Sequence, residues 1–568
     1  MTVFAGVISL SNEPPSSQLL TDVRKQFAVL CNQKATFEQQ KSNTLILQCD
    51  VQAYDNVTTL QSELHTTVIA GEPLLRNSYR TSLHDDVTQL HQAGADNNLS
   101  KILKTARGVF SGIHVDEAAN RIQLFSDKLG IRPVFYYQKD NIIVFSSLFS
   151  LFKYLPQLDL KTDFTGLCEY LAFNYCLSDR TQYQFIKRID VGQILNIEKG
   201  TVKISQYWNW ADIQAKSEAI AIDIEQLYKS FEDAIKLRLN DSNEAIAFLS
   251  GGLDSRVIAA SLKQHVKTLH TFNFSTHQSQ DREYARVFAK SAQIDHHEKV
   301  FESLSFPNWT QLIADATDEC AATGKIKSNQ RLVWSGDGGS VALGYVYIED
   351  VMLDALDKDN NKYAIDLFMA LAQTFVPKSF FKSKYVQLSK GVIEASILDE
   401  LPELHFGKTR SMYYFLMNND QKRHLSLHFE TICQHKTELH LPFFDSDFLQ
   451  NIYGFPAKEM MYHKLYMQWF EYFPKCARQT PWQTYPKHVP CPIKNTSSLS
   501  YQWDKSTTNH QNRKQDFSEY LALRKNRYIQ EFFNSQKLMI AMVLHRIGVK
   551  DYSYLIDKLK RLKVLVHN

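Results

Sequence analysis

Six consecutive residues in the middle of the chain, 250–255 with the sequence SGGLDS, combine two glycines, two hydroxyl groups and one carboxylate. The glycines allow backbone N–H groups to approach phosphate oxygens without Cβ clashes, and the hydroxyls of Ser250 and Ser255 can donate hydrogen bonds to the same oxygens. Asp254 is an acceptor and cannot bind phosphate itself, so its expected role is to hold Mg²⁺ beside substrate phosphates. The segment therefore indicates a site for a polyphosphate and a metal ion.

The sequence around this segment predicts the elements that would position it. Residues 245–249 form a short apolar run typical of a buried strand, and a helix is expected from Val257. The next strand is predicted at 268–274 and the next helix at 283–293. A Gly-Gly turn followed by a capping Asp or Ser could serve stability alone. The strand before it and the helix after it favour phosphate binding, and the alternation predicts a doubly wound parallel sheet.

The pattern changes on either side of this predicted sheet. Short apolar or alternating runs, separated by Asn, Asp and Gly, fill the first two hundred residues, with helical stretches at 19–32 and 83–92. This mixture predicts packed sheets with helices, whereas the chain beyond Tyr345 has a mainly helical pattern. The predicted fold class is α/β, with an α+β sandwich domain at 1–208, a parallel-sheet domain at 209–494 and a helical C-terminal extension at 495–568.

Composition and charge narrow the classes of partner. The 568 residues are 44% hydrophobic and 22% charged, with a net charge of +3 and no basic block, so neither nucleic acid nor a membrane surface is an expected partner. The eight cysteines lack CxxC spacing, which favours buried reduced thiols over disulfides or a metal site. The N-terminus has no signal-peptide pattern, and the apolar run 538–544 is far shorter than the ~20 residues of a membrane span. We therefore expect a cytoplasmic protein.

Several segments resemble the asparagine synthetase superfamily, whose synthetase domain is an ATP pyrophosphatase with an SGGxDS loop. Residues 335–339 (SGDGG) match the family's SGxGxDE loop, and 438–445 (ELHLPFFD) are similar to its ExRxPFLD motif. Residues 108–112 (GVFSG) and 127–133 (DKLGIRP) resemble segments of the N-terminal glutaminase domain of the family. The resemblance implies an Ntn-type sandwich in the N-terminal domain and an ATP pyrophosphatase in the second.

The resemblance also implies a two-step reaction with ATP and Mg²⁺. A substrate carboxylate attacks the α-phosphorus, pyrophosphate leaves, and an amine attacks the acyl-adenylate to give an amide and AMP. Mg²⁺ would be held by Asp254 and Ser340. Asp337 could assist deprotonation of the amine, although an Asx turn is an equal alternative, and Lys487 would neutralise developing charge. The expected ATP-binding residues are Leu249, Ser250, Gly251, Gly252, Asp254, Ser255, Phe272, Asn273, Ser335 and Gly336.

The chain departs from the family's pattern in both domains. Thr2 stands where glutamine-dependent members have the nucleophilic Cys, and Ala70 replaces the Asn that helps to form the oxyanion hole. We therefore expect a glutaminase-like domain without glutaminase activity. In the second domain Ser340 replaces an acidic Mg²⁺ ligand and His440 replaces an Arg. These changes leave ATP binding plausible and put ordinary asparagine synthesis in question.

Three functions remain open on this sequence. The first is an amide-forming synthetase whose amine does not come from glutamine, a layout similar to that of lasso-peptide cyclases and β-lactam synthetases. The second is an asparagine synthetase that uses ammonia, and the third is a non-catalytic nucleotide-binding scaffold. The expected partners are a carboxylate and an amine, as small molecules or peptides, with a homodimer as a possible assembly.

Overall fold

The computed structural model describes most of the chain, namely residues 2–11, 13–54, 58–75, 82–213, 222–302, 307–326, 331–372, 374–401, 407–493, 499–501 and 510–565. The chain divides into two compact units, each built from separate segments. The first contains residues 1–151, 189–349 and 402–502, and the second contains 152–188, 350–401 and 503–568. The predicted domain boundaries after residues 208 and 494 follow the order of the sequence, and they stay a prediction.

Two antiparallel sheets form the N-terminal part of the first unit. The hydrogen-bonded order in one sheet includes β8 (Phe135–Lys139), β9 (Ile142–Ser146), β1 (Thr2–Ser9), β3 (Thr44–Asp50) and β2 (Phe37–Gln40). The order in the other is β12 (Thr201–Gln206), β11 (Gln193–Glu198), β7 (Arg121–Ser126), β6 (Phe110–Asp116), β5 (His65–Gly71) and β4 (Thr59–Gln61).

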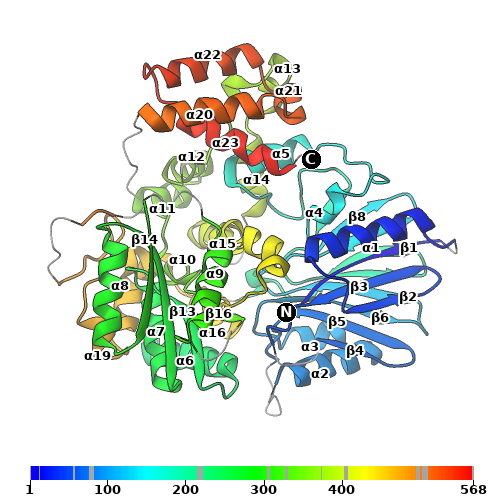
Figure 1. Cartoon of the computed structure of the whole chain (residues 1–568), viewed down its shortest axis with the longest axis horizontal. Helices are drawn as coiled ribbons and strands as arrows, with labels where there is room; N and C mark the ends of the chain where they lie inside the picture. Colours follow the sequence, from blue (N-terminus) through cyan, green and yellow to red (C-terminus); the bar gives the residue numbers. More distant parts are fainter. Residues whose placement is uncertain are drawn as a thin grey trace. The chain divides into compact units, whose positions relative to one another are not determined.

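Helices cover the outer faces of these two sheets, and apolar side chains fill the space between them. α1 (Ser17–Cys31) lies on one outer face, and α2 (Leu83–Ala95) with α3 (Leu99–Leu103) lies on the other (Figure 1). Phe4 and Phe145 from one sheet meet Ile113 and Leu124 from the other in the buried core. Burial on both faces explains why strands such as β1 lack a polar side. The predicted Ntn-type α+β sandwich is confirmed.

The second part of the first unit contains a five-stranded parallel sheet. Its order is β15 (Asp295–Phe301), β14 (Thr268–Thr276), β13 (Glu244–Phe248), β16 (Leu332–Trp334) and β17 (Glu438–His440). From β13 the chain moves outwards first to β14 and β15 and later to β16 and β17. The strand order therefore reverses between β13 and β16, and ligands bind at such a switch point, outside the carboxyl ends of the strands. The predicted doubly wound sheet is confirmed.

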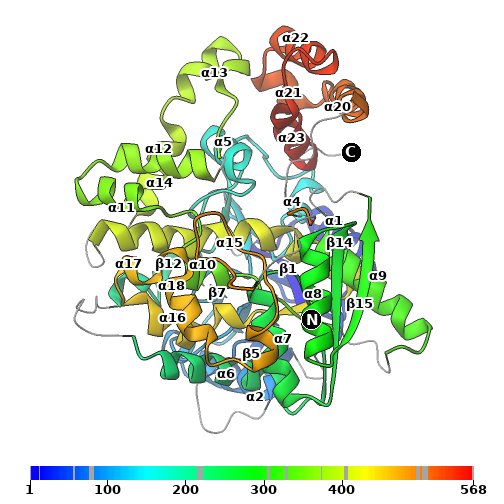
Figure 2. The ribbon, with the colours of Figure 1, turned by 90° about the vertical axis from the view of Figure 1, so that its left-hand side faces the viewer.

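Helices pack on both faces of the parallel sheet. α7 (Asp254–His265) and α8 (Gln280–Ser291) lie on one face, and α9 (Trp309–Ala322) lies on the other with α15 (Gly407–His435) beyond it (Figures 1 and 2). The remaining helical elements of this unit are η1 (Trp210–Asp212), α6 (Ile224–Leu239), α10 (Gly339–Gly344), η3 (Pro442–Phe444), α16 (Ser446–Tyr453), α17 (Ala457–Met460), η4 (Met461–His463), α18 (Lys464–Phe470) and α19 (Lys475–Arg478).

The second unit is mainly helical, as the sequence predicts for the C-terminal part of the chain. Lys558 Nζ donates to Ala172 O at 3.0 Å, and the hydroxyls of Tyr528 and Tyr183 are 3.0 Å apart, so the first and the last of its three chain segments are joined by buried polar contacts. α4 (Ser150–Lys153) spans the division at residue 151. The other elements are α5 (Phe164–Phe173), β10 (Ile186–Arg188), α11 (Asp350–Asp357), α12 (Asn361–Leu371), η2 (Lys378–Phe380), α13 (Ser383–Leu388), α14 (Val392–Glu400), α20 (His510–Leu523), α21 (Arg527–Phe532), α22 (Ser535–Arg546), α23 (Ser553–Arg561) and η5 (Leu562–Leu565). Among the described residues, no helix combines the length and the hydropathy that a membrane crossing requires.

Candidate nucleotide-binding site

The SGGLDS segment leaves the carboxyl end of β13 and enters α7 at Asp254. Ser255 Oγ accepts from the backbone N–H of Ser250 at 2.8 Å and lies 2.9 Å from Ser250 Oγ. Ser250 Oγ in turn accepts from the N–H of Gly252 at 3.2 Å. A Cβ on Gly252 would meet only Ser250 Oγ, at 3.4 Å. The turn therefore holds the hydroxyls of Ser250 and Ser255 and the backbone N–H of Gly252 close together. The space beside them stays open because residue 252 has no side chain.

The loop after β16 closes against this turn, so the two sides of the switch point are in direct contact. A Cβ on Gly336 would lie 2.6 Å from Ser255 N, and a Cβ on Gly339 would lie 2.6 Å from Asp254 Cγ. Cβ atoms essentially never come this close to other atoms, so a side chain at either position would force its neighbours to shift. The glycines of the SGDGG segment are thus required for the close approach of the two loops, which the sequence match alone does not explain.

Asp254 and Ser340, the two predicted metal ligands, lie together. Ser340 donates to Asp254 Oδ2 twice, from its backbone N–H at 2.9 Å and from its hydroxyl at 2.8 Å. His463 Nε2 lies 3.2 Å from the same hydroxyl, and burial lowers the pKa of this imidazole to about 3. Asp254 is therefore held by a neutral hydroxyl where the superfamily pattern has a second acid.

The other carboxylate oxygen of Asp254 is unused. Asp254 Oδ1 is buried and has no hydrogen-bond partner among the residues that the structure describes. Burial raises the pKa of Asp254 to about 6, against the lowering effect of the two hydrogen bonds from Ser340 and of the neighbouring Tyr466 hydroxyl. A buried carboxylate oxygen without a partner is costly unless a cation or donor reaches it. Mg²⁺ is bound in proteins through one or two carboxylates plus substrate phosphates, so this donor set fits the ion.

Two residues that the sequence reading missed position the loop. Asp281, in the first turn of α8, accepts from the N–H of Gly251 at 3.0 Å, and burial raises its pKa to about 6. Arg256, fully buried in α7, donates to the carbonyls of Thr480 and Pro481 at 2.8 and 2.6 Å. Asp281 follows the neighbouring strand β14, and adjacent parallel strands end at the same sheet edge. Asp281 could therefore have been identified from the sequence with this rule.

Asn273 and Phe272 have mainly internal contacts. Asn273 Nδ2 donates to Leu249 O at 2.8 Å and to Asp281 Oδ2 at 3.2 Å, so the amide holds the end of β13 in place. The Phe272 ring stacks on His297 with centroids 4.7 Å apart. Leu249 is buried and its N–H donates to Phe272 O at 2.9 Å. These predicted ATP contacts lie level with the end of β13, beside the loop, and their contact with nucleotide stays a prediction.

The predicted catalytic residues are in different surroundings. Asp337 accepts from Ser335 Oγ at 2.6 Å, within the loop after β16. Gln483 donates its N–H to Gly251 O at 2.9 Å, so the segment before Lys487 reaches the SGG turn. The side chain of Lys487 itself is 66% exposed, and its Nζ pairs with Glu349 at 2.7 Å. The structure thus brings Asp337 to the site, and brings the late segment there without its lysine ammonium group.

In the N-terminal sandwich, Thr2 is buried at the start of β1. Thr2 Oγ1 donates to Thr58 Oγ1 at 2.7 Å, and Thr58 Oγ1 also donates to Asp50 Oδ2 at 3.1 Å. Gln48 Nε2 lies 3.4 Å from Thr2 Oγ1 and donates to it. Ala70 lies buried in β5 and offers no side-chain donor. The hydroxyl at the expected nucleophile position is therefore part of a closed set of hydrogen bonds.

Buried ion pairs connect the sandwich to the parallel sheet. Arg132 donates to both carboxylate oxygens of Glu438 in β17, at 2.9 and 2.8 Å, and also to Thr2 O at 3.0 Å. Burial raises the pKa of Glu438, but Arg132 and His428 outweigh it and lower the pKa to about 2. His440 Nδ1 lies 3.2 Å from Glu72 Oε1, in the segment that replaces the family's oxyanion loop. Residues of the sandwich thus support the strand that ends beside the site.

Comparisons with known proteins agree with this arrangement. The family model for asparagine synthase matches residues 226–335, and the model for a glutamine amidotransferase domain matches residues 78–208. The chain is 24% identical over 259 residues to putative glutamine-hydrolysing asparagine synthetase 2 of Methanocaldococcus jannaschii, covering 43% of this chain and 50% of that protein. It is 27% identical over 172 residues to asparagine synthetase 3 of Bacillus subtilis, covering 29% and 28%.

A mammalian relative gives a similar result. The chain is 26% identical over 305 residues to the asparagine synthetase of Rattus norvegicus, covering 47% of this chain and 51% of that protein. The chain spans about half the length, or less, of the curated relatives it matches. Both domain types match in the order seen in the structure, with the SGGLDS and SGDGG loops at the switch point. The two matched regions are thus similar to the amidotransferase and synthetase domains of asparagine synthetases.

Proposed function

We propose that this chain is an ATP-dependent carbon–nitrogen ligase that converts a substrate carboxylate into an acyl-adenylate and transfers the acyl group to an amine, with AMP and pyrophosphate as products. The observation that supports it best is the junction of the two loops at the switch point. There Asp254, Ser340 and the SGG turn lie together, and Asp254 Oδ1 is buried without a partner among the described residues. Such a partly unpaired polar cluster suits a charged ligand better than it suits stability.

The SGG turn would bind the pyrophosphate part of ATP. The Gly252 N–H and the hydroxyls of Ser250 and Ser255 now bond one another, and a phosphate oxygen can replace these internal acceptors. α7 is a twelve-residue helix that starts at Asp254, and the partial positive charge at its N-terminus stabilises a bound phosphate. Mg²⁺ held by Asp254 Oδ1 and Ser340 Oγ would supply the positive charge that the triphosphate needs. These groups bind and orient the leaving pyrophosphate.

The loop after β16 would face the reacting carboxylate. Asp337 is half-buried and bonded to Ser335, which fixes its carboxylate within the loop. A carboxylate there can accept a proton from the attacking amine as the amide bond forms. Lys487 is our candidate for the cation that offsets charge on the acyl and phosphate oxygens, and this role requires its ammonium group to leave Glu349. Its exposed position makes such a movement inexpensive, because surface ion pairs contribute little.

The amine in this proposal does not come from glutamine hydrolysis by this chain. Thr2 stands at the nucleophile position with its hydroxyl in hydrogen bonds to Thr58 and Gln48, and Ala70 cannot act as an oxyanion donor. Catalysis of amide hydrolysis depends heavily on oxyanion donors, so their loss removes most of the rate enhancement. Asparagine formation from ammonia is the second candidate, favoured because the relatives are asparagine synthetases.

The test is exchange of labelled pyrophosphate into ATP. The full chain is incubated with ATP, Mg²⁺, labelled pyrophosphate and one carboxylic acid at a time, with aspartate included. The proposal predicts exchange that depends on one acid, because acyl-adenylate formation is reversible, and AMP formation once an amine is added. Asp295→Ala, at an exposed position at the start of β15, serves as a control that should keep the exchange. Formation of ADP and phosphate, or ATP binding without exchange for any acid, would contradict it.

A further inference from the structure

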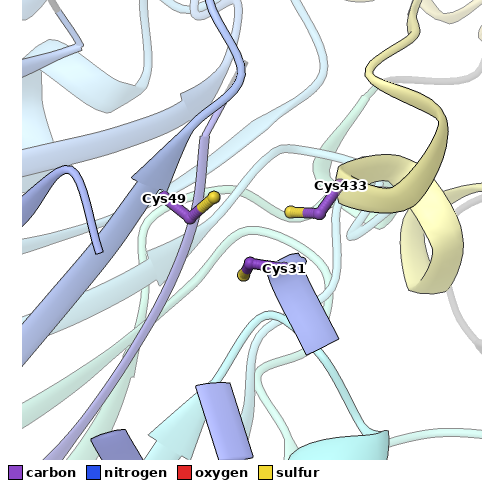
Figure 3. Close-up of side chains that lie close together, drawn as sticks. All are labelled: Cys31, Cys49 and Cys433. Atoms are coloured by element: carbon purple, nitrogen blue, oxygen red, sulfur yellow. The ribbon is translucent and has the colours of Figure 1, made fainter. Parts of the chain in front are cut away.

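Three cysteines from distant parts of the sequence meet in the first unit. Cys31 is the last residue of α1, Cys49 lies in β3, and Cys433 lies in the last turn of α15. All three are buried, and their sulfur atoms lie within 4.8 Å of one another. Figure 3 shows the three side chains converging from a helix, a strand and a second helix. No other group of three His, Cys, Asp or Glu ligand atoms gathers this closely in the described part of the chain.

A polar and a charged side chain lie beside the cluster. Gln33 Nε2 donates to Cys49 Sγ at 2.8 Å. Arg132 is close enough for its positive charge to act on Cys433. A hydrogen-bond donor and a cation are therefore available to a negatively charged group at this place.

The chemistry of three converging sulfurs selects a narrow class of ligand. Thiolates are soft ligands, which bind Zn²⁺ and Cu⁺ and have little affinity for hard cations such as Mg²⁺ and Ca²⁺. We propose that Cys31, Cys49 and Cys433 bind one thiophilic metal ion, Zn²⁺ in preference to Cu⁺, at a site separate from the nucleotide-binding loops. Each thiol loses its proton on binding, so three protons leave for each ion bound.

The charge of the site favours Zn²⁺ over Cu⁺. Three thiolates and one Zn²⁺ have a net charge of −1, whereas the same thiolates with Cu⁺ have a net charge of −2. A buried charge is costly, and the smaller one is easier to compensate by the Arg132 guanidinium and by the Gln33 amide. Zn²⁺ normally takes four ligands, and the fourth position is open to a water molecule or to the Gln33 side chain, which already contacts Cys49.

Metal binding here would join the sandwich to the synthetase part. Cys31 and Cys49 belong to the N-terminal sandwich, and Cys433 belongs to α15, against which α1 packs. A ligand that binds the folded chain and not the unfolded chain stabilises the fold, by an amount that grows with the logarithm of the ligand concentration divided by Kd. A metal at this position therefore acts as a cross-link between the two parts, and the expected sign is a higher unfolding midpoint with metal than without.

The experiment uses the full-length chain, reduced and freed of metal by a chelator, without ATP. Titration with Cd²⁺ should produce a thiolate-to-metal charge-transfer band that saturates at one ion per chain. The intensity of the band should correspond to three bound thiolates, and three protons should be released for each ion bound. Competition with a chromophoric chelator then gives the Zn²⁺ and Cu⁺ affinities. Cys31→Ser, Cys49→Ser and Cys433→Ser should each weaken Zn²⁺ binding by at least ~10–100-fold, the range seen even for loss of outer contacts. Cys168→Ser, at a buried cysteine of α5 outside the cluster, should leave it unchanged.

The wild-type titration does not depend on whether a variant folds, and it is sufficient by itself to overturn the proposal. Absence of a stoichiometric charge-transfer band in the reduced wild-type chain would do so. A band of equal strength in all three serine variants would do so as well, because the metal would then bind elsewhere. If the protein purified without reductant carries a disulfide between two of these cysteines and the reduced form takes no metal, the cluster is a redox pair instead of a metal site.

Discussion

The two candidate sites of this chain differ in how their polar groups are satisfied. In the sandwich, the Thr2 hydroxyl donates to Thr58, which donates to Asp50, so the hydrogen-bond sequence ends in a carboxylate inside the protein. At the switch point, Asp254 Oδ1 is buried and has no partner among the described residues. The first arrangement is complete without a ligand and the second is not. We infer from this difference that the sandwich site acts as a structural support and that the switch point is the site that binds a ligand.

Arg132 connects the sandwich to the parallel sheet by hydrogen bonds to both. Its guanidinium donates to Thr2 O in the sandwich and to both oxygens of Glu438 in β17 of the parallel sheet. Arg107 similarly bonds Asp445, which follows the end of β17, at 3.0 Å. The sandwich therefore has a structural role whether or not it hydrolyses glutamine, because it holds the strand that borders the SGGLDS and SGDGG loops.

The largest expected effect is that of Asp254→Ala on pyrophosphate exchange. Removal of the carboxylate removes the expected ligand of Mg²⁺ and leaves the charge of the triphosphate uncompensated. We therefore expect the exchange rate to fall by at least ~10²–10³-fold, comparable to the loss of one key electrostatic partner. The variant should remain folded, because the pKa of Asp254, raised by burial to about 6, marks a carboxylate whose charge opposes folding at neutral pH. Circular dichroism and exchange rate are measured together. Near-normal exchange in a folded variant would remove Asp254 from the site.

The next effect is on stability, through the link between the two regions. Glu438→Gln leaves the buried Arg132 without its ionic partner, and we expect a loss of about 3–5 kcal/mol in the free energy of unfolding. The pKa of Glu438 is lowered from 4.5 to about 2, so its contribution is present above pH 4.5 and is lost as the pH falls towards 2. The free energy of unfolding of the wild type, measured with urea, should decrease as the pH is lowered across that range. The free energy of unfolding of Glu438→Gln should decrease less. The exposed Glu63→Gln is the control, and equal stability of all three forms would contradict the link.

A smaller effect is expected from Ser340→Asp, which restores the second carboxylate beside Asp254. A site with one carboxylate binds Mg²⁺ weakly, so the added charge should lower the Mg²⁺ concentration needed for half-maximal exchange by several-fold. Ser340→Ala removes the hydroxyl that now bonds Asp254 Oδ2 and should raise that concentration. Exchange is measured against Mg²⁺ for the three forms. Identical Mg²⁺ curves would show that Ser340 is not near the ion.

The sequence predicted those features that depend on neighbouring residues. The apolar run before SGGLDS, the glycines and the following helix are local signals, and the strand, loop and helix lie where they were expected. Both fold types were predicted for the same reason, because strand and helix patterns repeat over short distances. The hydroxyls of Ser250 and Ser255, which are predicted to donate to the same phosphate oxygens, lie 2.9 Å apart.

Contacts across long sequence distances could not be predicted in this way. Arg256 reaches carbonyls more than two hundred positions away, and the cysteines at 31, 49 and 433 have no spacing pattern, because only the fold brings them together. The predicted role of Lys487 depends on where a side chain points, and in the structure its ammonium group pairs with Glu349. Such orientations depend on tertiary packing, which the sequence pattern does not specify.

The most direct test of the difference between the two sites measures AMP and glutamate in one reaction. The full chain receives ATP, Mg²⁺, the carboxylic acid found by exchange, and either glutamine or ammonium as nitrogen source, and Thr2→Ala is run beside it. We predict that AMP forms only where ammonium or another accepted amine is supplied, that glutamine gives no glutamate above the enzyme-free background, and that Thr2→Ala has the same AMP rate. Glutamate released in step with AMP, and lost in Thr2→Ala, would show that the sandwich site is active and would contradict the account.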